Sequence, residues 1–121
     1  MLARPESVIE RGGAIVFARR GQEIVGTGGL EALEGGDFEI IKMAVTPSCR
    51  GWGIGQLLMD RLVEMAIDRG AHWVRIETAT SLVPANALYR KNGFVSARVQ
   101  KSLHGYSRAD AFYERRVRGD D

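Results

Sequence analysis

The stretch RGWGIGQLLMD, residues 50–60, places three glycines directly before a run of apolar residues at helical spacing. From Gly53 to about residue 69 the apolar positions recur every three or four residues with charged residues between them, which predicts an amphipathic helix. Gly70 follows at the place of a left-handed C-terminal cap. Glycines at a helix N-terminus expose backbone N–H groups beside a positive partial charge, so this stretch is suited to hold a phosphate. A tight turn without a ligand is the alternative.

Strands are predicted on both sides of this helix. Residues 14–18 (AIVFA) and 23–30 (EIVGTGGL) flank a tight-turn signal and form a hairpin. Residues 38–45 (FEIIKMAV) add a third antiparallel strand, which we expect to be covered on both faces. Residues 72–79 (HWVRIETA) alternate as a strand after the helix, and a strand, helix, strand order implies a right-handed parallel crossover. The predicted central sheet is therefore mixed.

The remaining segments complete an α/β (α+β) fold in one domain over residues 1–121. A second helix is predicted from near Pro84 to Gly93, because proline suits the first helical position and glycine the end. Residues 94–100 (FVSARVQ) and 111–117 (AFYERRV) are predicted as a strand pair. Helices packed on a mixed sheet are the expected architecture.

Composition excludes several classes of function. The 121 residues are 45% hydrophobic and carry 17 basic against 15 acidic side chains, so charge suggests neither a nucleic-acid partner nor a membrane partner. A single cysteine, Cys49, excludes an internal disulfide, and His72 and His104 share no ligand spacing with it, so no metal site is expected. With no apolar run of about 18 residues and no signal peptide, a cytoplasmic protein is expected.

Two familiar phosphate loops do not match the glycine stretch. A nucleotide-hydrolysing P-loop needs Lys and then Ser or Thr after its last glycine, where this chain has Gln56 and Leu57. A dinucleotide fingerprint belongs to the first strand-to-helix turn, with a carboxylate on the next strand. Glu77 stands near that distance, but three predicted strands precede the loop.

The pattern Arg-x-x-Gly-x-Gly does match, carried by Arg50, Gly53 and Gly55 after MAVTP. With it, the chain resembles the GNAT superfamily of acetyl-CoA-dependent N-acetyltransferases. The stretch PANALYRKNGF, residues 84–94, is similar to the second helix of that superfamily and stands at the expected separation from the loop. The resemblance extends from about Ile9 to the C-terminus, and the chain looks N-terminally shortened, without the first strand and helix. The resemblance also implies that residues 5–13 (PESVIERGG) are the tail of the second helix of that superfamily.

The resemblance implies that acetyl-CoA is the cosubstrate. Backbone N–H groups of the glycine loop would hold the pyrophosphate, and the end of the 38–45 strand would pair with the pantetheine arm where this strand splays from 73–79. The amide of Val45 would also polarise the thioester carbonyl. Many members bind pantetheine through an asparagine at the position of Leu82, for which Asn86 is the substitute or simply a surface residue. The implied cofactor-binding residues are Met43, Ala44, Val45, Arg50, Gly51, Trp52, Gly53, Ile54, Gly55, Gln56 and Asn86.

Two catalytic residues follow from the same resemblance. Tyr89 matches the tyrosine that protonates the departing thiolate in many members, although a tyrosine on an amphipathic helix is also a common core residue. Glu39 matches a glutamate that serves as base in some members, and an ion pair with Lys42 or Arg75 is the alternative. Strand alternation predicts that Glu39 shares one face with residues 41, 43 and 45 and so faces the thioester.

The implied activity is acetyl transfer to a primary amine by direct attack in a ternary complex, and a catalytically inactive acyl-CoA-binding module is the alternative. The acceptor is left open. Tyr106, Arg108 and Asp110 lie in the segment that often contacts the acceptor in this superfamily, or are turn residues. The short front indicates a piece of a longer protein, a partner subunit over the acceptor side, or lost activity. A homodimer is expected, because an uncovered sheet edge would otherwise face water.

Overall fold

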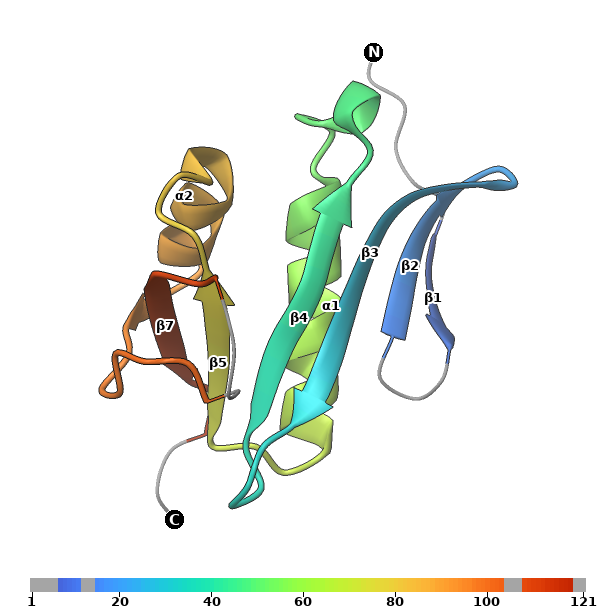
Figure 1. Cartoon of the computed structure of the whole chain (residues 1–121). Helices are drawn as coiled ribbons and strands as arrows, with labels where there is room; N and C mark the ends of the chain where they lie inside the picture. Colours follow the sequence, from blue (N-terminus) through green and yellow to red (C-terminus); the bar gives the residue numbers. More distant parts are fainter. Residues whose placement is uncertain (1–6, 12–14, 104–107, 119–121) are drawn as a thin grey trace.

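A computed structural model describes residues 7–11 as backbone and residues 15–103 and 108–118 in full. These residues form a seven-stranded sheet in the order β1-β2-β3-β4-β5-β7-β6. Figure 1 shows α1 crossing one face of the sheet beside β3 and β4, with α2 at the end where β5 finishes. The elements are β1 Ser7–Arg11, β2 Ile15–Arg20, β3 Glu23–Ala32, β4 Phe38–Val45, the short 3-10 helix η1 Pro47–Cys49, α1 Ile54–Asp68, β5 Trp73–Thr78, α2 Val83–Lys91, β6 Val95–Ser96 and β7 Ala111–Arg116.

The sheet is mixed, as the sequence predicts. Strands β1 to β4 form an antiparallel meander, β4 and β5 are parallel neighbours joined through α1, and β7 returns antiparallel to β5. Both predicted helices are present, and Gly70 and Gly93 have the positive φ angles expected just beyond their ends. Neither helix of the described ranges has the length and apolar character needed to cross a membrane.

Two segment predictions are wrong. The interpretation of residues 5–13 as a helix tail fails because residues 7–11 form β1, which pairs with β2 from Ser7↔Arg19 to Arg11↔Ile15. The strand predicted over 94–100 shrinks to Val95–Ser96, since the carbonyl oxygens of Val99 and Lys101 accept hydrogen bonds from the Arg75 guanidinium instead of from a neighbouring strand. In both cases a pairing with a distant partner outweighed the local pattern.

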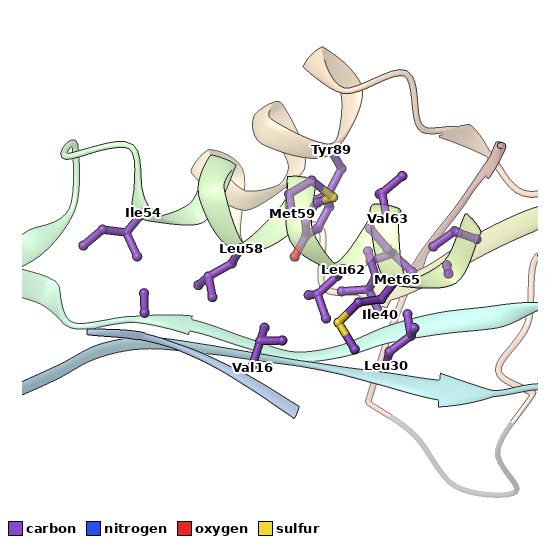
Figure 2. Packing of buried hydrophobic residues seen from close by; sticks show 14 of the residues in the cluster. Val16, Leu30, Ile40, Ile54, Leu58, Met59, Leu62, Val63, Met65 and Tyr89 are labelled. Carbon is purple, nitrogen blue, oxygen red and sulfur yellow. The ribbon is translucent and has the colours of Figure 1, made fainter. Parts of the chain in front are cut away.

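Helix α1 lies very close to the sheet. Leu58, Leu62 and their neighbours point from the helix onto Val16 and Leu30, as Figure 2 shows. Gly28 in β3 makes room for this approach. A Cβ atom at Gly28 would lie 2.8 Å from Cδ1 of Leu62 and 2.9 Å from Sδ of Met43. Position 28 is therefore glycine because neighbouring side chains occupy the space that a side chain at this position would need.

A β-bulge in β4 changes which side chains face the helix. Thr27 pairs with Ala44 but Gly29 pairs with Ile41, so two residues of β4 oppose one of β3. Lys42 sits in this bulge with a φ of 55°, in the left-handed region.

The bulge overturns the predicted alternation along β4. Met43 contacts the α1 side at Gly28, the side on which Ile40 joins the core. Glu39, next to Ile40, points to the opposite face. The expectation that residues 39, 41, 43 and 45 share one face is therefore wrong. The expected cover on both faces is also wrong, since Lys42 and Ala44 are exposed.

We predict that Gly28→Val lowers the free energy of unfolding by about 1–3 kcal/mol, because the new side chain overlaps Leu62 and Met43. Urea denaturation followed by circular dichroism measures the change. Thr27→Val is the matched control, since Thr27 is only half-buried, and it should change stability by no more than about 0.5 kcal/mol. Equal effects of the two substitutions would contradict close helix packing at Gly28.

Candidate active site

Strands β4 and β5 separate shortly after they meet. Their pairing runs only from Phe38↔Val74 to Ile40↔Ile76, and beyond Ile40 the two strands diverge, as Figure 1 shows. A cleft of about 450 Å³ occupies the split and continues to α2. Its walls include Glu39, Ile41 and Met43 from β4, Glu77 from β5, Tyr89 from α2, and Arg108. The split thus brings together residues that are up to 69 positions apart, counting from Glu39 to Arg108.

In the part of the chain that the structure describes, no strand pairs with β4 beyond Ile40 on the side of the split. The N–H of Thr46 donates to the carbonyl of Val25 in β3, at 2.8 Å. Since N–H directions alternate along a strand, the N–H of Val45 points to the other edge, toward the split. Met43, Ala44 and Val45 all lie beyond the last β4–β5 pair. This edge is open to an extended ligand that pairs with the strand.

Tyr89 reaches the cleft from the middle of α2. It is 5% exposed, and its ring packs edge-on against Phe94 and Tyr113, with centroid distances of 6.4 and 6.1 Å. Burial raises the pKa of the hydroxyl above its ordinary value, and the neighbouring Tyr113 adds to the increase. Tyr89 is therefore both a core residue and a cleft residue. At neutral pH it is a proton donor.

Two carboxylates line the cleft from the two strands. Glu39 on β4 is 2% exposed, and Oε1 lies 3.8 Å from Nε of Arg75. The alternative of an ion pair with Arg75 is thus confirmed, and Glu39 lines the cleft as well. Glu77 on β5 also lies 3.8 Å from Nε of Arg75, and Oε2 accepts a hydrogen bond from the amide of Leu103 at 2.9 Å.

Sequence reasoning missed Glu77 as an acid or base, having weighed it only for a ribose. The signal was available in the strand pattern. Arg75 and Glu77 stand two residues apart on β5 and so share a face. The parallel register pairs Glu39 with Arg75, which places both carboxylates around one arginine.

The glycine loop presents unused amides. Thr46 leads into η1, Gly51 and Gly53 have φ angles of 86° and 81°, and Gly53 precedes α1 as a left-handed N-cap. The amides of Arg50 and Trp52 donate within the loop, to the carbonyls of Pro47 and Cys49 at 3.3 Å. In the described part of the chain the remaining amides have no backbone acceptor. They belong to Gly51, Gly53, Ile54, Gly55 and Gln56.

Several side chains of the loop have structural contacts of their own. Trp52 packs against the core, and the guanidinium of Arg20 lies 5.1 Å from its ring centroid. Gln56 exchanges hydrogen bonds with the side-chain amide of Asn92 at 2.7 and 2.9 Å, which ties the start of α1 to the end of α2. Neither contact was predicted, because each joins residues distant in the sequence.

Asn86 contacts the loop before α2 and lies neither in the cleft nor on the exposed surface of the helix. Its Nδ2 donates to the carbonyls of Ala79 and Leu82, at 2.8 and 2.7 Å, and the residue is 4% exposed. It does not line the cleft, whereas Leu82 does. Asn86 therefore holds the loop between β5 and α2.

Asp110 and Cys49 do not line the cleft. Asp110 accepts hydrogen bonds from the amide and hydroxyl of Thr80, and these bonds, the amide first, lower the pKa of its carboxyl. Cys49 is buried in the core. Within the described ranges no three His, Cys, Asp or Glu side chains are grouped so as to hold a metal ion. Tyr106 and His104 lie outside the described residues.

Comparisons with known proteins agree with this geometry. The family model described as "Acetyltransferase (GNAT) family" matches residues 3–94. The N-alpha-acetyltransferase RimI of Mycobacterium tuberculosis is 35% identical over 108 residues, which cover 87% of this chain and 66% of that protein. The chain spans about half to two thirds of the length of the first two curated relatives it matches.

Solved structures show the same fold. A GNAT-family acetyltransferase from Staphylococcus aureus superposes with a TM-score of 0.79 at 25% identity, covering 86% of this chain and 68% of that one. Rv2747 from Mycobacterium tuberculosis, solved in complex with CoA, superposes with a TM-score of 0.63 at 26% identity, covering 74% and 53%. Family model, relatives and fold all coincide, and the chain belongs to the GNAT acetyltransferase family.

Proposed function

We propose that the protein transfers an acetyl group from acetyl-CoA to a primary amine by direct attack within a ternary complex. The observation that carries the proposal is the split between β4 and β5, where an open strand edge, Tyr89 and two carboxylates line one cleft. Membership of the GNAT family and the CoA bound to Rv2747 support acetyl-CoA as the donor. The expected single domain, homodimer and cytoplasmic location belong to the same proposal and rest on the sequence alone.

The glycine loop is proposed to hold the pyrophosphate of CoA. Amides of Gly51 and of residues 53–56 are available to donate, and Gly53 begins a 15-residue helix whose dipole favours an anion at this end. The amides of Arg50 and Trp52 are used inside the loop, so we assign these two residues to shaping it. The open edge of β4 at Met43, Ala44 and Val45 would pair with the pantetheine arm.

In the proposed reaction, residues on opposite walls of the cleft carry out the two proton transfers, one from the amine and one to the leaving thiolate. The N–H of Val45 is proposed to donate to the thioester oxygen while the amine nitrogen forms its bond to the carbonyl carbon. When the carbon–sulfur bond breaks, Tyr89 gives its proton to the thiolate, which its raised pKa suits because the hydroxyl is protonated beforehand. Holding amine and thioester together lowers the barrier further through orientation.

The acceptor must lose a proton before it attacks. For an amine with a pKa near 10.4, deprotonation at pH 7 costs about 4.6 kcal/mol, so a nearby base helps. Glu39 is the proposed base, and the structure adds Glu77 as a second carboxylate on the same cleft. Both are held at one arginine, and either can take the proton directly or through a water.

We expect Gly53→Asp to weaken acetyl-CoA binding at least about tenfold, because a carboxylate at the start of α1 repels the pyrophosphate. Isothermal titration with acetyl-CoA and desulfo-CoA measures the affinity. Gly35→Asp is the matched control, since Gly35 also has a positive φ, 91°, and open space around it, but lies in the β3–β4 turn. Similar losses in both variants would count against the loop as the pyrophosphate site.

We expect Tyr89→Phe to lower kcat at least about tenfold while acetyl-CoA affinity stays within about threefold, because only the proton donor is removed. Release of the CoA thiol during an amine screen measures turnover. Glu39→Gln and Glu77→Gln, compared in the same assay, show which carboxylate serves as the base. Wild-type chain that binds acetyl-CoA but releases no thiol with any amine would make the protein a binding module.

The raised pKa of Tyr89 predicts a late-titrating tyrosine. In an ultraviolet titration of tyrosine ionisation, one of the three tyrosines should ionise only above the ordinary midpoint near pH 10, and this phase should vanish in Tyr89→Phe. Because the folded pKa is raised, the stabilisation from the neutral hydroxyl is full below pH 10. It is lost as the pH rises through the folded pKa. A late phase that persists in Tyr89→Phe would refute this assignment.

A further inference from the structure

Arg75 occupies the centre of β5 on the face away from α1, between the two cleft carboxylates. It is 6% exposed, and Nε lies 3.8 Å from Oε1 of Glu39 and 3.8 Å from Oε2 of Glu77. Arg75 does not line the cleft itself. It lines a neighbouring hollow of about 520 Å³ together with Trp73 and Leu103. The guanidinium therefore approaches the carboxylates from behind and does not reach the proposed reacting atoms.

The remaining nitrogens of Arg75 are engaged elsewhere. One donates to the carbonyl of Val99 at 3.0 Å and another to the carbonyl of Lys101 at 2.5 Å, while the guanidinium carbon lies 5.4 Å from the Phe112 ring centroid. Nε is buried and has no hydrogen-bond partner among the described residues, so the side of the guanidinium that faces the carboxylates acts through charge. The carbonyl contacts fix the guanidinium in this position.

One cation between two carboxylates leaves a single net negative charge. Without Arg75, two buried carboxylates side by side would favour protonation of one of them, because like charges in a low-dielectric site repel. With Arg75 at 3.8 Å from each of them, both carboxylates can stay ionised. The two carboxylates on the cleft wall can then take a proton from an ammonium that lies beside them.

We propose that Arg75 is a positioning residue that keeps the Glu39–Glu77 pair ionised for a cationic amine acceptor. The inference rests on the proposed acetyl transfer and adds to it a residue outside the cleft and a charge state for the acceptor. It also gives a role to the segment after β6: the carbonyl groups of Val99 and Lys101 hold Arg75 in place, and the amide of Leu103 holds Glu77.

The charged groups around Arg75 have separate partners or positions. Glu31 on β3 stands directly opposite Glu39 and is exposed. Glu114 on β7 stands directly opposite Arg75 and is paired with Arg98 at 2.7 Å. Lys42 on β4 and Arg108 are exposed residues at the cleft, and Tyr89 lines it from α2. Arg98 stacks on Trp73, with its guanidinium carbon 3.8 Å from the ring centroid, and so serves the neighbouring hollow. Arg75 is thus the cation placed between Glu39 and Glu77.

Arg75→Gln tests the proposal through the pH dependence of turnover. We expect kcat/KM for the amine at pH 7 to fall at least about tenfold and the acidic limb of the profile to move up by about one unit or more, because loss of the cation makes the carboxylates harder to ionise. The KM for acetyl-CoA should stay within about threefold. Arg98→Gln removes a guanidinium from the same face as a control and should leave the acidic limb in place.

Arg75→Lys keeps the charge without the forked hydrogen bonds. Its acidic limb should stay within about 0.3 units of wild type, even where the melting temperature falls. If Arg75→Gln does not fold, this variant shows whether the positive charge at position 75 sets the acidic limb. An acidic limb that moves by a unit in Arg75→Lys, that stays in place in Arg75→Gln, or that moves equally in Arg98→Gln would overturn the proposal.

A carboxyl titration by carbon-13 NMR separates this inference from the proposed activity. The glutamate signals assigned through Glu39→Gln and Glu77→Gln should titrate at least about one unit higher in Arg75→Gln, or at wild-type positions in Arg75→Lys if the former is unfolded. If these shifts appear in a chain that releases no thiol, the charge role of Arg75 stands and the activity fails. If turnover is present and the signals do not move, the role of Arg75 fails alone.

Discussion

The candidate site depends on one constraint, that β4 and β5 stop pairing after Ile40. Parallel strands that continued side by side would use the backbone groups of residues 41–45 and leave no cleft. The bulge at Lys42 occurs where the pairing ends and turns Met43 toward α1 while Glu39 keeps the opposite face. The open strand edge therefore begins directly after the carboxylate of Glu39, and the bulge changes the face of the residues that follow.

The helix that follows β4 is held by close packing. Because residue 28 of β3 is glycine, Leu62 of α1 can pack directly against the strand backbone. The hydrogen bonds between the side-chain amides of Gln56 and Asn92 join the N-terminal turn of α1 to the end of α2. These contacts fix the glycine loop relative to the strand edge. A ligand that spans both must match a set distance, which favours a long molecule with an anionic group at one end.

The sequence predicted the parts of the fold that local patterns determine. Helical periodicity identified α1, and the glycine loop with ALYRKNGF located the family and Tyr89. Features that depend on distant partners were missed. The bulge at Lys42 cannot be predicted from a strand pattern of period two. Glu77 can be recognised as a second carboxylate of the cleft only when the parallel register, which places Arg75 beside Glu39, is known. Asn86 appeared to be a ligand residue because its helix face was known but its loop contacts were not.

In the proposed reaction, the two walls of the cleft move protons in opposite directions. On the helix wall, burial keeps Tyr89 protonated at neutral pH, so this side can only donate. On the strand wall, Glu39 and Glu77 stand beside the guanidinium of Arg75 and are the proposed proton acceptors. A reaction in the cleft would release a proton from the nucleophile toward the strands and supply one to the leaving group from the helix. Amide formation from an ammonium and a thioester needs protons to move in these two directions. Water, the nucleophile in hydrolysis, lacks the positive charge by which an ammonium is attracted to the two carboxylates.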